Sequence, residues 1–181
     1  MRGLVFFVKI TDRFSGWIGH AAAWLMIPVV LVAFGVVLMR YLFSVGYPWM
    51  QEVYIWLHGV AFMLAAALVL RDEGHVRVDL FYKRFSPRAR AWADFAGVWL
   101  FLMPMMFVII TMSWPIVLRS WRMMEQSPTA DGLPFLYLLK SMVLVFCVLV
   151  TLQGLALAGR SLLVILGRED QLAPSGPGGH A

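Results

Sequence analysis

The chain has 181 residues, of which 61% are hydrophobic and 14% charged, and its formal net charge at pH 7 is +5. Water-soluble domains are about half apolar and about one quarter charged, so this composition excludes an ordinary soluble globular domain and indicates a protein that resides in a lipid bilayer. The chain has one cysteine, Cys147, which excludes a disulfide or a cysteine-built metal cluster within these residues.

Four stretches without Asp, Glu, Lys or Arg are about as long as a membrane-spanning helix, which needs about 20 apolar residues. They are residues 14–39, 53–70, 95–118 and 141–159. Lipid offers no hydrogen bonds to the backbone, so runs of this length favour helices. The sequence therefore predicts an all-α membrane protein with four transmembrane helices in one domain, residues 17–166. The helices are expected at about 17–43, 49–71, 90–120 and 135–159.

The first sixteen residues predict a short helix that lies in the membrane interface before the first span. Apolar residues recur there at helical spacing beside basic ones, a pattern typical of interfacial helices. The apolar set is Leu4, Phe7, Ile10 and Phe14, and the basic set is Arg2, Lys9 and Arg13. Within the first span, Pro28 predicts a kink, because proline interrupts the helical hydrogen bonds.

The segment "LRDEGHVRVDLFYKRF", residues 70–85, separates the second and third spans and is rich in charge. Apolar residues at 78, 81, 82 and 85 share one helical face, which predicts an amphipathic helix lying flat on the membrane. Its expected anchoring residues are His75, Arg77, Asp79, Phe81 and Phe85. The last segment, 167–181, is rich in Gly and Pro, and we expect a disordered tail.

Lys and Arg are distributed unevenly between the two sides of the predicted bundle. Four spans place both termini and the connection at 71–90 on one side, which holds eleven of these residues, against four on the other. Cytoplasmic segments carry the excess of Lys and Arg, so the termini and the interfacial helix are predicted to be cytoplasmic. Membrane lipid, and no nucleic acid, is the partner that this positive charge indicates.

Glu52 lies on one face of the second predicted span, together with Trp49 and Trp56. An acidic residue inside the membrane is a functional hypothesis by default. Glu52 lies about one turn from the outer end, where water or a basic side chain such as Arg40 or Lys140 could meet it. We therefore favour a structural or subunit-interface role over ion transport, because an ion carrier usually has its carboxylate near the midplane.

Two histidines in predicted spans, His20 and His58, raise the question of a haem. With an inward N-terminus they differ in depth by about a third of the membrane, which disfavours a shared iron, although a single-histidine site stays open. We find no nucleophile with a base, no phosphate-binding loop and no metal-ligand cluster in the sequence, and we expect no cofactor and no enzymatic activity. Two alternatives remain open: a small ion-coupled transporter that uses Glu52, and a haem-containing redox anchor that uses His58.

Four motifs in this order resemble the small membrane subunit, or DctQ-like component, of tripartite ATP-independent periplasmic (TRAP) transporters. They are "RYLF" at 40–43, "WMQE" at 49–52, "GHVRVD" at 74–79 and "GLPFLYLLK" at 132–140. With the four spans, the resemblance covers residues 12 to about 166. It implies a multi-pass subunit of the bacterial inner membrane that serves the uptake of organic acids.

The resemblance also implies two protein partners, a large permease subunit that carries the substrate and a periplasmic substrate-binding protein. We expect the small subunit to brace the permease and to help dock the binding protein. The expected permease contacts are Arg40, Trp49, Glu52 and Trp56, and the expected docking loop on the outer side includes Arg122, Glu125, Asp131 and Lys140.

Overall fold

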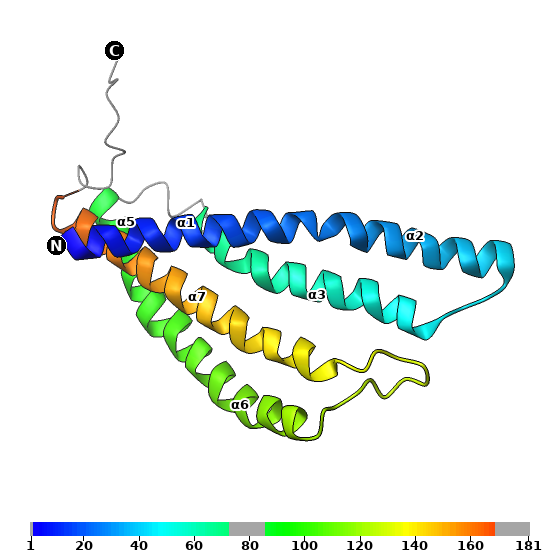
Figure 1. Ribbon diagram of the computed structural model, residues 1–181. Helices are drawn as coiled ribbons and strands as arrows, with labels where there is room; N and C mark the ends of the chain where they lie inside the picture. The colour runs from blue at the N-terminus through cyan, green and yellow to red at the C-terminus, as the bar shows by residue number, and fades with distance from the viewer. Residues whose placement is uncertain (1, 73–85, 169–181) are drawn as a thin grey trace, which may run out of the picture.

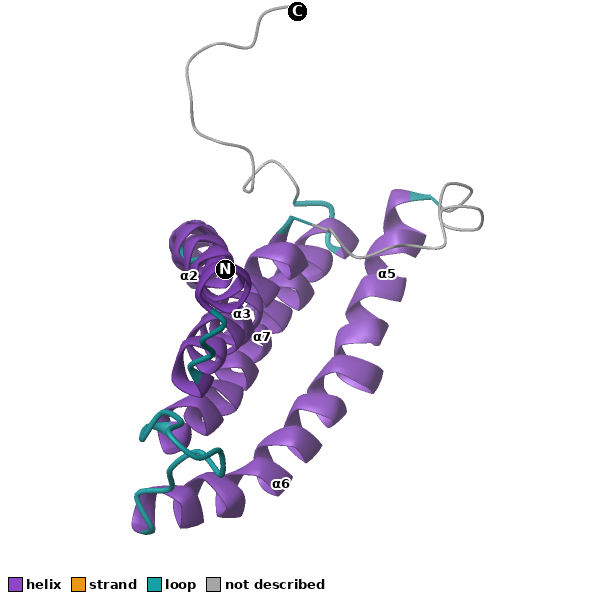
Figure 2. Ribbon diagram, turned by 90° about the vertical axis from the view of Figure 1, so that its right-hand side faces the viewer, coloured by secondary structure: helices purple, strands orange, loops and turns teal. Residues whose placement is uncertain are grey.

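The computed structural model describes residues 2–72 and 86–168, and within these ranges the chain forms helices and short connections without a strand (Figure 2). Most of the predicted interfacial helix, with His75, Arg77, Asp79, Phe81 and Phe85, lies outside the described residues, as do residues 169–181 of the predicted tail. The helices are α1 (Arg2–Trp24), α2 (Met26–Phe43), α3 (Pro48–Arg71), α5 (Pro87–Gly97), the π-helical turn η1 (Val98–Leu102), α6 (Met103–Arg122) and α7 (Leu136–Ile165).

Four segments of the described chain are long and apolar enough to cross a membrane. They are Gly3–Phe43, Pro48–Arg71, Pro87–Arg122 and Leu136–Ile165. This confirms the predicted all-α architecture with four spans. The starts of α1 and α5 and the ends of α3 and α7 lie toward one end of the molecule, which we call the terminal end (Figure 1). The α2–α3 and α6–α7 connections lie toward the opposite end, which we call the hairpin end.

The first span is a nearly continuous helical rod, interrupted only at Leu25 between α1 and α2. Pro28 explains the interruption, because it has no N–H to donate to the Trp24 carbonyl and its ring crowds that carbonyl. The boundary that we expected at residue 17 does not coincide with a helix end. The 41 residues of the rod extend about 60 Å, roughly twice the thickness of the hydrocarbon core, so part of it must tilt or project beyond the lipid.

The third span is likewise interrupted where a proline removes a backbone donor. The π-helical turn η1 ends one residue before Met103, and Pro104 follows directly. Since Pro104 cannot bond the Leu100 carbonyl, the backbone widens locally and then resumes as α6. Pro115 lies inside α6, which runs on to Arg122.

The central element is α7, which packs against α1, α3, α5 and α6. Within its most apolar window, 44% of the residues are buried inside the molecule, against 11% in each of the other spans. Figures 1 and 2 show α5 and α6 on one side of α7, with α3 and the α1–α2 rod on the other. The spans therefore form a curved layer in which α2 and α6 are the edges.

Small residues bring the helices of this layer close together. A Cβ atom added at Gly19 of α1 would lie 2.4 Å from the Leu68 Cβ of α3, and one added at Gly154 of α7 would lie 2.3 Å from Leu102 Cδ2. Met106, Cys147 and Val150 form the buried apolar cluster between α6 and α7. In lipid, where apolar surface drives little association, this close approach supplies the packing contacts that hold helices together.

We predict that Gly19→Ala lowers the free energy of unfolding by roughly 1–3 kcal/mol, because the Leu68 Cβ is fixed to its backbone and the two helices must separate. Thermal unfolding of the purified chain in detergent measures the change. Gly59→Ala is the matched control, since a Cβ there meets nothing within 4 Å and alanine favours helix. Equal loss of stability in both variants would contradict the close α1–α3 contact.

Candidate functional site

A group of polar side chains joins three helices at the terminal end, and we call it the Asp12 cluster: Asp12, Ser15, Arg71, Gln153 and Arg160. The Asp12 carboxylate accepts through Oδ1 from Gln153 Nε2 at 3.0 Å and from Arg160 Nη2 at 2.7 Å. Ser15 donates its hydroxyl to Gln153 Oε1 at 2.7 Å. Arg71 Nη1 donates to the Asp12 carbonyl at 3.0 Å. One turn of α1 is thereby tied to both α7 and α3.

Local sequence explains how α1 presents its side of this cluster. Asp12 and Ser15 are three residues apart and so share a face of α1. Gly16 follows, and a Cβ there would lie 2.2 Å from Arg71 Nη1, so the guanidinium occupies the space that a side chain at this position would take. Ser15 and Gln153 are almost completely buried. Because buried polar groups must be paired, each member of the cluster depends on the others.

A second group, the Glu52 cluster, fastens the α6–α7 connection at the hairpin end: Glu52, Ser127, Gly132 and Leu133. Glu52 accepts from the Ser127 hydroxyl through Oε1 and from the Leu133 backbone N–H through Oε2, the latter at 2.7 Å. Gly132 is tightly enclosed, because a Cβ there would lie 2.7 Å from Ser127 Cβ and 2.9 Å from Glu52 Oε1. The carboxylate at the start of α3 therefore sets the conformation of a loop about 80 residues later.

The suggestion that Glu52 meets Arg40 or Lys140 is wrong, because Glu52 bonds the α6–α7 loop. Lys140 instead pairs with Glu125, with 2.5 Å between Nζ and Oε2, and Arg40 is exposed at the end of α2. The Lys140 ammonium holds the pKa of the Glu125 carboxyl below its ordinary value. The Glu52 carboxylate accepts hydrogen bonds from a backbone N–H and a hydroxyl and pairs with no cation among the described residues. Such neutral donors cannot be identified from the charged residues in the sequence.

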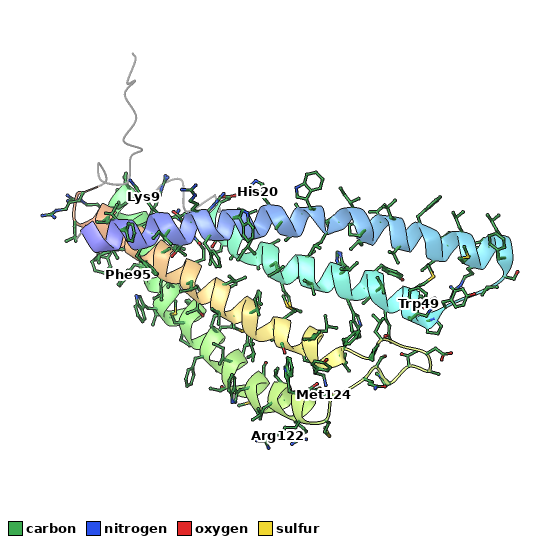
Figure 3. The ribbon with its side chains drawn as sticks, in the orientation of Figure 1. Lys9, His20, Trp49, Phe95, Arg122 and Met124 are labelled. Atoms are coloured by element: carbon green, nitrogen blue, oxygen red, sulfur yellow. The ribbon has the colours of Figure 1, made fainter. Side chains whose placement is uncertain are left out.

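The predicted contact residues do not form one surface. Glu52 and Trp56 face the α6–α7 side, where Trp56 lines a groove with Leu133 and Leu138. Trp49 lies at the hairpin end near the α2–α3 connection and packs on Tyr47, with ring centroids 6.3 Å apart (Figure 3). Arg40 and Trp49 are thus exposed, whereas Glu52 and Trp56 already contact other segments of the same chain.

The two helix ends that flank the predicted docking loop contact each other directly. Trp121 Nε1 donates to Ser141 Oγ at 2.7 Å, and the Trp121 ring packs against Tyr137 with centroids 4.7 Å apart. Arg122 and Asp131 are exposed, and Asp131 has a positive φ of 60° at the turn before Gly132. Of the four predicted docking residues, two are paired with each other and two face outward.

The two histidines differ in environment. The His20 ring shares a hydrogen bond through Nδ1 with the Gly16 carbonyl of its own helix, at 2.6 Å. His58 is exposed in the middle of α3. Within residues 2–72 and 86–168, no three His, Cys, Asp or Glu side chains gather as a metal site would require.

The sequence interpretation missed the pairing within the Asp12 cluster. It assigned Asp12 to an interfacial segment and read Arg71 and Arg160 only as topological charges. Gln153 was the available signal, because a polar residue inside a span must find a partner. Its partners are 138 and 141 residues away in the chain, so the signal showed a need for pairing without showing the partners.

The fold and the two clusters define a multi-pass helical membrane protein whose carboxylates at Asp12 and Glu52 fasten its own segments. The family described as "Tripartite ATP-independent periplasmic transporters, DctQ component" matches residues 29–163, and the chain belongs to this family. It is therefore a transporter component, the small permease subunit, and its family is not one of enzymes. Neither curated proteins nor solved structures gave a significant match.

We predict that Asp12→Ala lowers the free energy of unfolding by roughly 1–3 kcal/mol, because Arg160 and Gln153 lose a partly buried acceptor. Thermal unfolding in detergent measures the loss. Asp72→Ala is the matched control at the same end. Its side chain is 52% exposed, and its pair with Arg71 is expected to contribute about 1 kcal/mol or less. A loss from Asp72→Ala as large as that from Asp12→Ala would refute the role given to the Asp12 cluster.

We predict that Glu52→Leu speeds hydrogen exchange of the Leu133 amide about tenfold, because the amide loses its acceptor. Glu52→Gln is expected to change exchange little, since an amide side chain can accept from Leu133 and donate to the Ser127 hydroxyl. Exchange measured by mass spectrometry on the 123–135 segment distinguishes the two variants. Glu125→Leu, which removes a nearby carboxylate bonded to Lys140, is the control.

Proposed function

We propose that this chain braces the large permease subunit of a TRAP transporter and forms no transport path of its own. The observation that carries the proposal is the engagement of Asp12 and Glu52 in holding helices and a loop of the same chain. A coupling carboxylate must exchange its partners during transport, whereas these two are fixed by several bonds each. Family membership supports the same assignment.

We further propose that the terminal end lies in the cytoplasm of a bacterial cell and the hairpin end faces the periplasm across the inner membrane. The support is the distribution of Lys and Arg, eleven on the terminal side and four on the hairpin side. In this orientation the α6–α7 connection reaches the compartment of the substrate-binding protein.

The α6–α7 connection is suited to docking that protein, in our proposal, because it is held in one conformation before any partner arrives. Glu52 bonds the loop at Ser127 and Leu133, which leaves Arg122 and Asp131 exposed. A preformed surface loses less conformational freedom on binding than a flexible loop. The proposed permease contacts remain the exposed faces near Arg40 and Trp49. Organic acids are the substrate class that we propose, on the family resemblance, with selectivity in the other two components.

Reconstitution of vesicles with the large permease subunit, this chain and the binding protein tests the bracing role. We expect uptake of an organic acid only when all three are present, and none with this chain alone. Glu52→Gln is expected to preserve uptake because both bonds of the Glu52 cluster can be kept, whereas Glu52→Leu is expected to reduce it. Loss of uptake in Glu52→Gln with an intact complex, or uptake by this chain alone, would instead establish a coupling role.

A further inference from the structure

A polar side chain stands alone on an apolar strip in the middle of α3. The strip, formed by Ile55, His58, Phe62 and Val69, is exposed along its length. His58 lies ten residues after Pro48 and thirteen before Arg71, so it is about 15 Å from the start of the helix, near the middle of the span. The ring has no hydrogen bond to residues 2–72 or 86–168.

Two other polar side chains on exposed helix faces bond the backbone of their own helix. Thr111 donates its hydroxyl to the Phe107 carbonyl at 2.9 Å, and the His20 ring bonds the Gly16 carbonyl. Acyl chains can neither donate nor accept a hydrogen bond, so leaving the His58 ring against lipid costs free energy. His58 therefore requires a partner that brings a polar group to mid-membrane depth, which indicates protein rather than lipid.

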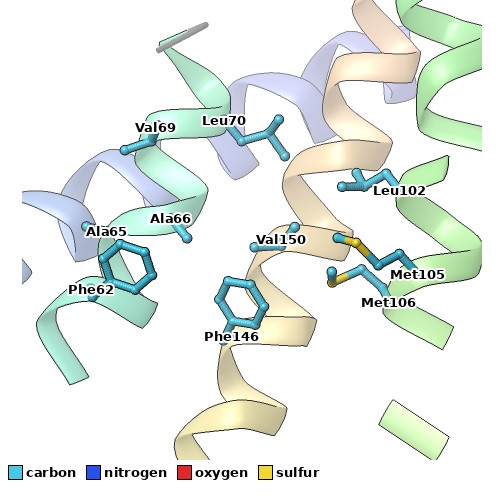
Figure 4. A pocket seen from close by; sticks show the side chains of 10 residues that line it. All are labelled: Phe62, Ala65, Ala66, Val69, Leu70, Leu102, Met105, Met106, Phe146 and Val150. Atoms are coloured by element: carbon cyan, nitrogen blue, oxygen red, sulfur yellow. The ribbon is translucent and has the colours of Figure 1, made fainter. Parts of the chain in front are cut away.

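The shape of the neighbouring surface indicates which protein. The strip continues into an apolar groove of about 320 Å³ between α3, α7 and α6. Figure 4 shows Phe62 on the α3 side of this groove, facing Met105 of α6 and Phe146 of α7. A twofold contact between copies of one chain requires a self-complementary patch. Two copies that met groove to groove on a twofold axis would leave it unfilled, whereas a helix from another membrane component of the same tripartite transporter would fill it.

We propose that the strip and groove receive a transmembrane helix of the large permease subunit that carries a hydrogen-bonding side chain opposite His58. This rests on the proposed function and specifies its intramembrane contact. The helix fills the groove with apolar side chains and bonds the imidazole at the depth where water is scarce. His58 thereby fixes the depth and rotation of that helix, in the way that polar side chains within spans select their partners.

Co-purification tests the assignment of His58. A tagged full-length chain is co-expressed with the large permease subunit, and the amount of permease recovered in detergent is measured. His58→Leu is expected to reduce recovery about threefold to tenfold, the effect of one intramembrane hydrogen bond. His58→Asn, which can still donate and accept, is expected to restore most of it. His20→Leu is the control, since its ring bonds its own helix.

If the His58→Leu variant recovers as much permease as the unaltered chain does, the proposal is overturned and the bracing role stays intact. If the unaltered chain recovers no permease, the proposed function itself fails. A photoreactive residue placed at Phe62 identifies the occupant directly, with Phe107 of α6, similarly exposed, as the control. A higher yield of the cross-linked adduct with the permease from position 62 than from position 107 supports the proposal. Equal labelling from both positions, or adducts only with lipid or a second copy, would overturn it.

Discussion

The hydrogen bonds made by Asp12 are the interactions on which the arrangement of α1, α3 and α7 depends. The Asp12 carboxylate accepts from Gln153 and Arg160 of α7, while the Asp12 backbone carbonyl accepts from Arg71 of α3. In lipid the apolar faces of helices gain little by meeting each other, so polar bonds and close packing determine which helices pair. One aspartate thus specifies how α1 lies on its neighbours, and it holds the amino-terminal part of the rod, which precedes the family-matched residues 29–163, against the rest of the chain.

From this junction the spans diverge into a curved layer with α7 in its interior. The Glu52 cluster at the other end connects α3 to the loop before α7, so both ends of the layer are fastened while the edge helices α2 and α6 stay exposed. A layer with fixed ends and large uncovered apolar faces is suited to packing against a larger membrane protein. The same residues that give the chain its shape are the ones that our proposal excludes from a transport path.

The architecture could be predicted because it follows from local properties. A run of about 20 apolar residues without charge favours a membrane-spanning helix largely independently of its neighbours, and Pro28 and Pro104 interrupt hydrogen bonds within a few residues of themselves. The contacts within the candidate site were harder to predict from the sequence. For Glu52 the sequence favoured a structural or subunit-interface role, but it did not reveal that a hydroxyl and a backbone amide are its partners or that Glu52 and Trp56 face the chain's own loop. The pairing of Asp12 with Arg160 spans 148 residues and left no local pattern.

The sequence by itself determined the solvent, the number of spans and the resemblance to a transporter component, because hydrophobic run length, charge placement and short motifs are properties of neighbouring residues. Tertiary structure alone decided that the first span is one rod tied to its neighbours by Asp12, that Glu52 orders the α6–α7 connection, and that His58 faces outward without a partner among the described residues. Each of these features depends on which helices pack together and on how each helix is rotated about its own axis. Such choices arise from side-chain bonds between segments far apart in the chain, which a linear pattern does not contain.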